Sequence, residues 1–323
     1  MKKIGILTSG GDAPGMNAAI RASVRTAIYR GLEVVGIKRG YDGLMDGDFI
    51  PMDSNSVSDI IQRGGTILKT SRSERYKTKD GMLDAKQKAS EAGIEGLILI
   101  GGDGTFKGAR EFSEISGINS IGIPGTIDND LFGTDYTIGY DTALNTVIDA
   151  VDKIRDTASS HHRLFFVEVM GRDSGFIALN SGIAAGAEDI LIPEEKTDIT
   201  ELIERLEAGR KRNKSSFIII VAEGEEPGGA FELAKRVKEK YNFVETLVTI
   251  IGHMQRGGNP TCFDRILASR LGVAATEGLI NGRINEMAGL INNEIVFTPF
   301  AKTRKHLLNN NEELLRMARM LSL

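Results

Sequence analysis

Two carboxylates lie close to a hydroxyl in the segment Thr126-Ile127-Asp128-Asn129-Asp130, which follows an apolar run at residues 118–123. Asp128 and Asp130 flank a single residue, so on an extended loop both side chains point the same way. One carboxylate would then take a proton from a substrate hydroxyl, and the other would face a metal ion. A polar Asx turn is the alternative interpretation, because Asp and Asn favour such turns.

A third carboxylate, Asp103, lies in Gly101-Gly102-Asp103-Gly104-Thr105, directly after the apolar run at residues 97–100. Small residues on both sides leave room for a nucleotide. The alternative is that Asp103 caps the following helix, although a cap needs no glycines on both sides. A dinucleotide-binding fingerprint does not fit, because Gly102, Gly104 and Gly108 have the wrong last spacing.

A glycine loop, Gly-Gly-Asp-Ala-Pro-Gly at residues 10–15, separates an apolar run from a predicted helix. Backbone N–H groups at a helix start suit a bound phosphate. The loop is not a Walker motif, since Met16 and Asn17 stand where Lys and Ser or Thr are required. A tight strand-to-helix turn that serves packing alone is the alternative.

The loops also supply cationic side chains: Arg72, Arg163, Arg172, His253 and Arg256. Guanidinium groups suit phosphate, so this set in an acidic protein indicates phosphorylated ligands. Each arginine alone is more often a surface ion-pair residue. The inference therefore depends on their shared position at strand or loop ends.

Three further features have ordinary structural interpretations. Arg21 and Arg25 lie four residues apart on a predicted helix and share a face, which is solvated by default. The pair His161-His162 has no acidic or thiol partner at ligand spacing, so we interpret it as structural. Cys262, beside Phe263, is expected to be a small buried side chain.

The composition favours a soluble protein of a reducing cytoplasm. A net charge of −4 argues against nucleic-acid binding. The single cysteine cannot form an intramolecular disulfide, and with four scattered histidines it makes a zinc site unexpected. We see no apolar signal segment at the N-terminus and no run long enough to span a bilayer, so export and membrane binding are not expected.

Strands and helices that alternate along the chain must position these loops. The apolar runs predict strands at residues 4–7, 34–37, 97–100, 118–123, 164–169, 217–222 and 247–251, and helices are predicted at 17–29, 56–62, 106–112 and 142–159. Residues 41–43 are predicted to be a loop. This alternation predicts an α/β protein with doubly wound parallel sheets, with ligands at the carboxyl ends of the strands. At 323 residues we expect two lobes, with a change near Gly139 and a return near Gly257.

These motifs together resemble those of the bacterial phosphofructokinases, and the resemblance covers essentially the whole chain. It is carried by Thr8-Ser9-Gly10-Gly11-Asp12, Gly101-Gly102-Asp103-Gly104-Thr105, Pro124-Gly125-Thr126-Ile127-Asp128-Asn129-Asp130, Glu168-Val169-Met170-Gly171-Arg172 and Gly252-His253-Met254-Gln255-Arg256-Gly257-Gly258. It implies a cytoplasmic, glycolytic kinase that uses ATP and Mg²⁺ to phosphorylate fructose 6-phosphate at its 1-hydroxyl. It also implies a homotetramer of chains with two Rossmann-like lobes and the active site between them. We expect an ATP-binding lobe of residues 1–139 with 255–305, and a sugar-phosphate-binding lobe of residues 140–254 with 306–323.

The resemblance also implies residue roles. Asp128 would be the general base, with Thr126 beside it, Asp103 would hold Mg²⁺, and Asp130 would assist through water. The Gly11 N–H, Arg72 and Arg172 would stabilise the transferred phosphoryl group, and Gly104, Thr105 and Gly108 would also contact the nucleotide. The sugar would meet Met170, Glu223 and His253, with Arg256 and a neighbouring subunit's Arg163 at its 6-phosphate. An effector site for a nucleotide diphosphate or phosphoenolpyruvate would include Arg21, Arg25, Arg155, Glu188, Arg212 and Lys214.

Four positions of the family pattern bear on the phosphoryl donor, the sugar phosphate and the effector. The pyrophosphate-using branch has Asp and Lys where this chain has Gly104 and Gly125, so ATP is the expected donor. A second sugar-phosphate arginine is replaced by Leu247, and one effector arginine is replaced by Ser54.

Other functions remain as alternatives. A kinase of another ketose phosphate and a pyrophosphate-dependent enzyme are the nearest. A lipid or dinucleotide kinase shares the Gly-Gly-Asp-Gly-Thr loop but lacks the Thr-Ile-Asp-Asn-Asp segment. A nucleotide-sensing module without catalysis is disfavoured by the presence of Asp103, Asp128 and Arg172.

Overall fold

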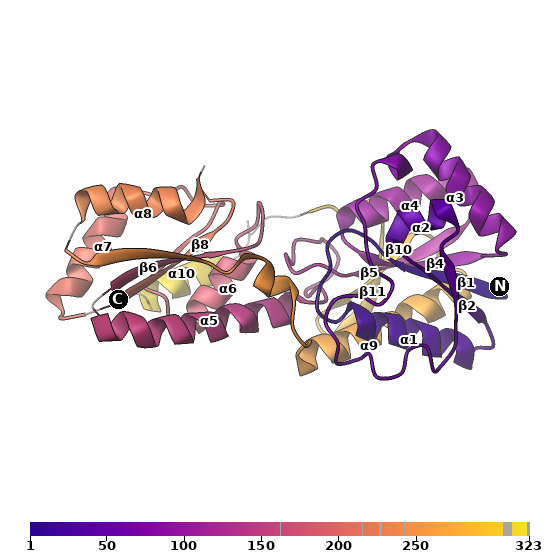
Figure 1. Cartoon of the computed structure of the whole chain (residues 1–323), viewed down its shortest axis with the longest axis horizontal. Coiled ribbons are helices and arrows are strands. Elements are labelled where there is room, and N and C mark those ends of the chain that lie inside the picture. The colour runs from indigo at the N-terminus through magenta and orange to yellow at the C-terminus, as the bar shows by residue number, and fades with distance from the viewer. Residues whose placement is uncertain (162, 215, 226–227, 242, 306–311, 322–323) are drawn as a thin grey trace. The chain divides into compact units, whose positions relative to one another are not determined.

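The structure, a computed structural model, describes residues 1–323 except 162, 215, 226–227, 242, 306–311 and 322–323. The chain forms two compact units (Figure 1). Unit 1 is Met1–Thr142 with Arg256–His306, and unit 2 is Ala143–Gln255 with Leu307–Leu323. Each unit is therefore built from two separate stretches of sequence. Which ligand each unit binds stays a prediction.

Unit 1 contains a mixed sheet whose described strands run in the order β11-β10-β5-β4-β1-β2-β3. The strands are β1 (Lys3–Thr8), β2 (Glu33–Ile37), β3 (Phe49–Met52), β4 (Gly96–Gly101), β5 (Asn119–Pro124), β10 (Glu286–Ile291) and β11 (Glu294–Pro299). The inner strands pair in parallel, whereas β3 and β11 are antiparallel edges. The parallel centre brings the loops after β1, β4 and β5 to one edge of the sheet.

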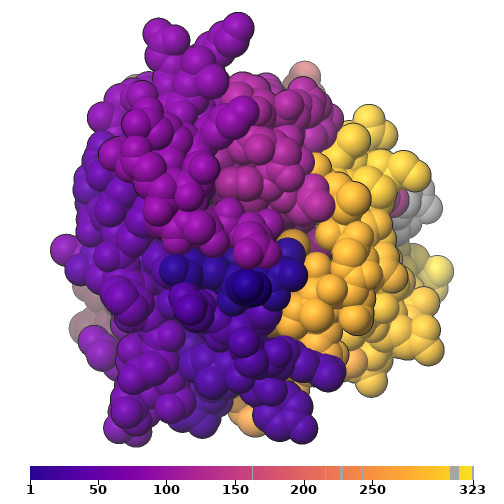
Figure 2. Space-filling model, turned by 90° about the vertical axis from the view of Figure 1, so that its right-hand side faces the viewer, coloured from indigo at the N-terminus to yellow at the C-terminus, as the bar shows by residue number. Residues whose placement is uncertain are grey.

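Helices cover both faces of this sheet (Figure 1). On one face lie α1 (Met16–Tyr29) and α9 (Cys262–Ile280), and on the other α2 (Gly40–Asp46), α3 (Lys79–Glu91) and α4 (Asp103–Ser116), with the short 3₁₀ helix η1 (Arg75–Lys77) nearby. Alternate residues of each strand face opposite sides, so Leu97 and Leu99 of β4 join the core beneath α3 and α4. Figure 2 shows how the orange C-terminal part of unit 1 adjoins the indigo and violet N-terminal part on one surface.

Unit 2 contains a parallel sheet with described strands in the order β7-β8-β6-β9. They are β6 (Arg163–Val169), β7 (Asp189–Leu191), β8 (Phe217–Ala222) and β9 (Glu245–Ile250). The helices α7 (Ile199–Lys211) and α8 (Gly229–Lys240) pack on one face over a core that includes Phe166 and Ile219. The other helices of this unit are α5 (Tyr140–His161), α6 (Phe176–Ala184) and α10 (Glu312–Leu321), and the 3₁₀ helix η2 (Gly252–Arg256) follows β9.

The fold class predicted from the sequence is confirmed, but two local predictions are wrong. Residues 56–62 form turns rather than a helix. Asp53 accepts hydrogen bonds from the backbone of Asn55 and Ser56, and Asp59 is left-handed (φ 54°), so the segment cannot continue as a helix. Residues 41–43, predicted to be a loop, lie inside α2. Its flanking glycines concealed this short helix.

Among the described residues, no helix is both long enough and apolar enough to cross a lipid bilayer.

Candidate active site

The two acidic loops begin side by side because they follow neighbouring parallel strands. Gly101 at the end of β4 is in register with Pro124 at the end of β5. The Gly125 N–H then donates a hydrogen bond to the Gly101 carbonyl at 2.9 Å. The predicted grouping of Asp103 with Asp128 and Asp130 therefore follows from strand order alone.

Asp103 is the first residue of α4, and Gly102 is the residue that caps the helix. The alternative interpretation, in which Asp103 is the cap, is wrong. The helix begins three residues earlier than predicted, so the Asp103 side chain projects from the first turn, where the backbone N–H groups have no helical partner. Asp103 is half-buried, and Gly104 beside it is exposed, with open space where a β-carbon would point.

The loop that carries Asp128 and Asp130 is buried and sharply bent. Asp128 is 3% exposed and Asp130 4% exposed. Asn129 between them has a left-handed backbone (φ 51°), so the expectation of an extended loop is wrong at this residue. The Asx-turn alternative is closer, since Asn and Asp tolerate this conformation. The Asp128 N–H also donates to Thr126 Oγ1 at 3.2 Å.

Negative charge accumulates around Asp130. Burial raises the pKa of this carboxyl, and the nearby charges of Asp128 and Asp103 raise it further. Lys305 opposes them, with its Nζ 3.2 Å from an Asp130 carboxylate oxygen. Asp128 and Asp103 therefore lie close enough to Asp130 to act on it electrostatically, as residues of a common site do.

The glycine loop at residues 10–15 is tied to two other segments. The Gly10 N–H donates to the Ser71 carbonyl at 3.2 Å, and Thr70 Oγ1 donates to the Gly10 carbonyl at 2.9 Å. These bonds place Arg72, which is exposed, next to the loop. Arg256 is 8% exposed and donates to the Asp12 carbonyl at 3.0 Å, and a β-carbon at Gly11 would lie only 2.7 Å from its guanidinium.

Thr105 and Gly108 lie on the first turns of α4. Thr105 is buried, and its Oγ1 donates to the Ser9 carbonyl at 3.2 Å, so its side chain connects the first glycine loop to α4. Gly108 lies against the stacked rings of Tyr41 and Tyr76, whose centroids are 3.9 Å apart. The Tyr41 hydroxyl donates to the Thr105 carbonyl at 2.6 Å.

Unit 2 gathers a second set of predicted site residues at the carboxyl ends of β6, β8 and β9. Met170 N–H donates to the buried Gln255 side chain at 2.9 Å, just beyond His253 on η2. Arg172 has a left-handed backbone (φ 55°), and its N–H donates to the Glu223 carboxylate at 2.9 Å. Met170, Arg172, Glu223 and His253 therefore belong to one loop cluster.

Arg163 does not lie with this cluster. It begins β6, whereas Met170 and Arg172 follow the end of that strand, so the expectation of a shared position for the cations is wrong for Arg163. Arg163 instead pairs with Glu245 at 2.6 Å, across the parallel strands β6 and β9. Leu247 is half-buried on the edge strand β9.

Some of the predicted effector residues surround the buried carboxylate of Glu188. Lys214 Nζ is 2.9 Å from it and an Arg155 nitrogen is 3.6 Å away. Arg212 lines the same small hollow. Arg21 and Arg25 lie on α1 in unit 1, and Ser54 lies in the turn after β3.

The remaining expectations concern histidine, cysteine and metal. His161 is exposed at the end of α5, and His162 lies outside the described residues. Cys262 is exposed, so the expectation of a buried thiol is wrong. Over the described part of the chain, no group of three His, Cys, Asp or Glu side chains is arranged to hold a metal ion.

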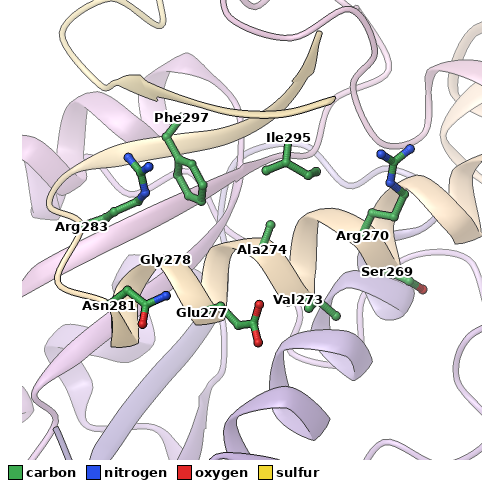
Figure 3. Close-up of a pocket in the computed structure, with 10 residues that line it drawn as sticks. All are labelled: Ser269, Arg270, Val273, Ala274, Glu277, Gly278, Asn281, Arg283, Ile295 and Phe297. Carbon is green, nitrogen blue, oxygen red and sulfur yellow. The ribbon is translucent and has the colours of Figure 1, made fainter. Parts of the chain in front are cut away.

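A groove of about 680 Å³ on unit 1 contains none of the predicted site residues. Figure 3 shows its walls, with Val273 and Ala274 on α9 and Ile295 and Phe297 on β11. A smaller open depression of about 500 Å³ does include Arg72, together with Arg39 and Asp42.

Three residues of the site were not found from the sequence. Lys305 faces Asp130 from a position 175 residues away along the chain, and no local pattern signals that contact. Tyr41 and Tyr76 stack beneath Gly108, but single tyrosines on unrelated segments carry no sequence signal. The left-handed turn at Asn129 was also not predicted, although an Asn between two acids in a loop is a local signal for αL backbone.

The sequence of this chain is similar to those of known phosphofructokinases over nearly its whole length. A profile of the phosphofructokinase family matches residues 3–279. The chain is 54% identical over 323 residues to ATP-dependent 6-phosphofructokinase 1 of Thermus thermophilus, covering all of both chains. It is 57% identical over 306 residues to ATP-dependent 6-phosphofructokinase 2 of Bacteroides thetaiotaomicron, covering 95% of this chain and 94% of the relative.

Solved structures agree with this similarity. Pichia pastoris phosphofructokinase in the T-state superposes with a TM-score of 0.88 at 37% identity, covering 94% of this chain and 35% of that chain. The pyrophosphate-dependent phosphofructokinase of Marinobacter aquaeolei has a TM-score of 0.85 at 21% identity, covering 100% of this chain and 91% of that chain. At this lower identity the second comparison shows the fold alone.

Proposed function

Because this chain belongs to the phosphofructokinase family, we propose that it transfers the terminal phosphoryl group of ATP to the 1-hydroxyl of fructose 6-phosphate. The product is fructose 1,6-bisphosphate, as in glycolysis. The observation that carries the proposal is the meeting of Asp103, Asp128 and Asp130 at the carboxyl ends of neighbouring strands. Phosphoryl transfer needs positioning and charge neutralisation, and these loops supply groups for both.

Asp128 acts as the general base. Its carboxylate takes the proton of the sugar 1-hydroxyl as that oxygen attacks phosphorus, and Thr126 lies beside it in the same turn. Burial of the loop excludes water, which would otherwise compete with the sugar for the phosphoryl group.

The acids also suit a Mg²⁺ ion. Oxygen ligands from one or two carboxylates, completed by phosphate oxygens and water, are its usual environment in kinases. Burial raises the pKa of Asp130, and the negative charges of Asp128 and Asp103 raise it further; a divalent cation would offset those charges. Asp103 would hold the ion, with Asp130 assisting through water. When bound, Mg²⁺ neutralises charge on the phosphates.

The transferred phosphoryl group also needs donors from the protein. The Gly11 N–H and Arg72 come from unit 1, and Arg172 comes from unit 2. Backbone N–H groups of a glycine loop and guanidinium groups both suit phosphate oxygens. Gly104, Thr105 and Gly108 hold the rest of the nucleotide. The open space beside Gly104 supports ATP over pyrophosphate as the donor.

The sugar phosphate is held by Met170, Glu223 and His253 in unit 2, with Arg256 and a neighbouring subunit's Arg163 at the 6-phosphate. Two observations support this: the first three belong to one loop cluster, and Arg163 lies at the opposite end of β6 from them. A homotetramer would supply Arg163 from a second chain.

We place the enzyme in the cytoplasm.

An effector site completes the proposal. Arg155, Glu188, Arg212 and Lys214 of unit 2, with Arg21 and Arg25 of unit 1, would bind a nucleotide diphosphate or phosphoenolpyruvate. The contacts of Arg155 and Lys214 with Glu188 support a preformed group of charges.

A coupled assay of ADP release tests the reactions with ATP, and an assay of released inorganic phosphate tests the reaction with pyrophosphate, which forms no ADP. The panel contains fructose 6-phosphate and other ketose phosphates, each with ATP, and fructose 6-phosphate with pyrophosphate, with and without Mg²⁺. We expect the highest kcat/KM with ATP, Mg²⁺ and fructose 6-phosphate. Equal rates with pyrophosphate, or a higher kcat/KM for another ketose phosphate, would contradict the proposal.

A further inference from the structure

The side chain of the residue between the two loop aspartates is hydrogen-bonded to the backbone of two later residues. Asn129 is 8% exposed, and its side-chain oxygen accepts the Thr137 N–H at 2.7 Å. Its side-chain nitrogen donates to the Asp135 carbonyl at 3.1 Å. Thr137 is 1% exposed, and its Oγ1 donates to the Thr126 carbonyl at 2.6 Å. We call these two residues and their mutual bonds the Asn129–Thr137 clasp.

The clasp closes the loop on itself. The Ile138 N–H donates to the Pro124 carbonyl at 2.9 Å, so residues 124–130 lie against residues 135–138 at several points. The next residue, Gly139, donates its N–H to buried Asp264 on α9 at 2.8 Å. The acidic loop is therefore fixed to α9 through the segment after it.

Backbone geometry gives the clasp a specific consequence. A left-handed residue between two others breaks the alternation of side-chain directions that an extended strand would impose. The directions of the Asp128 and Asp130 carboxylates are therefore set by the φ and ψ angles of Asn129. A non-glycine residue stays in this conformation when surrounding bonds compensate its cost, and the amide bonds of Asn129 do so here.

We propose that Asn129 and Thr137 are positioning residues, which fix the directions of the Asp128 and Asp130 carboxylates for proton abstraction and phosphoryl transfer. The proposal rests on the function proposed above. Neither residue needs to touch a substrate, because each acts through the backbone of the loop. A general base must lie within hydrogen-bond reach of its proton, so small reorientations of Asp128 matter.

The test compares Thr137→Val with Thr134→Val. Both remove a buried hydroxyl from the same loop, but Thr134 Oγ1 contacts Tyr136 and Leu290 instead of residues 126–130. A similar loss of stability is expected from both. Only Thr137→Val should lower kcat, by about tenfold to a hundredfold, the scale on which a misplaced catalytic group acts. The KM for ATP should change little, and Thr137→Ser should restore kcat.

Asn129→Gly is a second variant that tests the proposal. Glycine keeps the left-handed backbone accessible but deletes the amide bonds, so folding should survive while kcat falls. The fall in kcat at a nearly unchanged KM for ATP, together with the rescue by Thr137→Ser, separates this role from a purely structural one.

Amide hydrogen exchange gives a readout without turnover. Exchange at residues 126–130 should be faster in Thr137→Val and Asn129→Gly than in wild type or Thr134→Val. Hydrogen exchange and kcat equal to those of wild type in both clasp variants would overturn the proposal. Inactive wild-type enzyme with faster exchange in the clasp variants would instead count against the proposed function and leave the loop-fixing role supported.

Discussion

At the scale of single residues, Asp128 carries the clearest expectation. Asp128→Ser should lower kcat by roughly 10²–10⁴, because removal of a general base costs about that much. Binding of ATP and fructose 6-phosphate should stay nearly unchanged, since the base acts on the transition state. Steady-state kinetics and calorimetric titration measure the two effects. Asp135→Ser is the control, because Asp135 is an exposed acid of the same loop. Wild-type turnover of Asp128→Ser would remove Asp128 from the mechanism.

Asp264 makes a different, pH-dependent prediction. It is fully buried on α9, and burial raises its pKa from 3.8 to about 6, although donors from Thr142 and Gly139 lower it. The folded protein therefore binds this proton more tightly than the unfolded chain. This contribution to the free energy of unfolding is on the order of 3 kcal/mol. It is present below the unfolded pKa of 3.8 and is lost as pH rises through about 6.

Asp264→Asn cannot titrate, so the variant should gain stability relative to wild type between pH 4 and pH 7. Urea denaturation at several pH values measures the difference. Asp84→Asn, at an exposed position on α3, is the control and should show no such trend. If the difference in free energy of unfolding between Asp264→Asn and wild type does not change with pH, the prediction is contradicted.

At the residue scale, the placement of the acids was predictable where they follow an apolar run and lie beside glycines. The grouping of Asp103 with Asp128 and Asp130 followed from the ends of two apolar runs. The turn at Asn129 and the contact of Lys305 with Asp130 depend on backbone angles and on distant chain segments. No periodicity in the sequence records either.

At the scale of elements, we expect the loops after β4 and β5 to determine the phosphoryl donor. Gly104 stands at the start of α4, and a β-carbon there meets no atom within 4 Å. Gly104→Asp should therefore fold normally, yet its carboxylate would repel a nucleotide phosphate. We expect kcat/KM for ATP to fall by at least about tenfold, the effect of about 1.4 kcal/mol. Thermal denaturation should show a wild-type Tm, and unchanged ATP kinetics would refute the donor assignment.

Long, strongly apolar elements were predictable, and short or polar ones were not. The strands β4, β5 and β8 stand out as continuous apolar runs because both of their faces are buried. The antiparallel edges β3 and β11 were not predicted, because β3 has only four residues and includes Pro51, and β11 mixes polar and apolar residues. The helix expected at residues 56–62 failed because Asp53 binds the backbone of the residues that follow it.

At the scale of the whole molecule, Leu247 tests the proposed supply of sugar-phosphate contacts by a neighbouring subunit. The family places an arginine from a neighbouring subunit at this position, so Leu247→Arg should restore a contact to the sugar 6-phosphate. A charge-assisted hydrogen bond contributes about 1.5–3 kcal/mol, which predicts a KM for fructose 6-phosphate lower by roughly tenfold or more. The kcat should change little, because a remote phosphate contact acts on ground and transition states alike.

Thr249→Arg is the matched control, since residue 249 lies two positions further along β9 and faces the same side. A KM that does not respond to Leu247→Arg would mean that another cation, such as exposed Lys240, already serves the phosphate, or that another sugar is preferred.

The division of unit 1 into two stretches of sequence also affects how the protein is made. On the ribosome, the strands β1 to β5 emerge long before β10 and α9, which complete the same unit. At 5–20 residues per second, synthesis of the intervening residues 143–255 takes roughly ten seconds. During that time the edge of β5 that later pairs with β10 is uncovered, as is the face of α1 that later packs against α9. All described strands of the sheet of unit 2, of which β9 is the last in the chain, are synthesised before β10 and β11, so the unit that starts first is the last to complete its sheet.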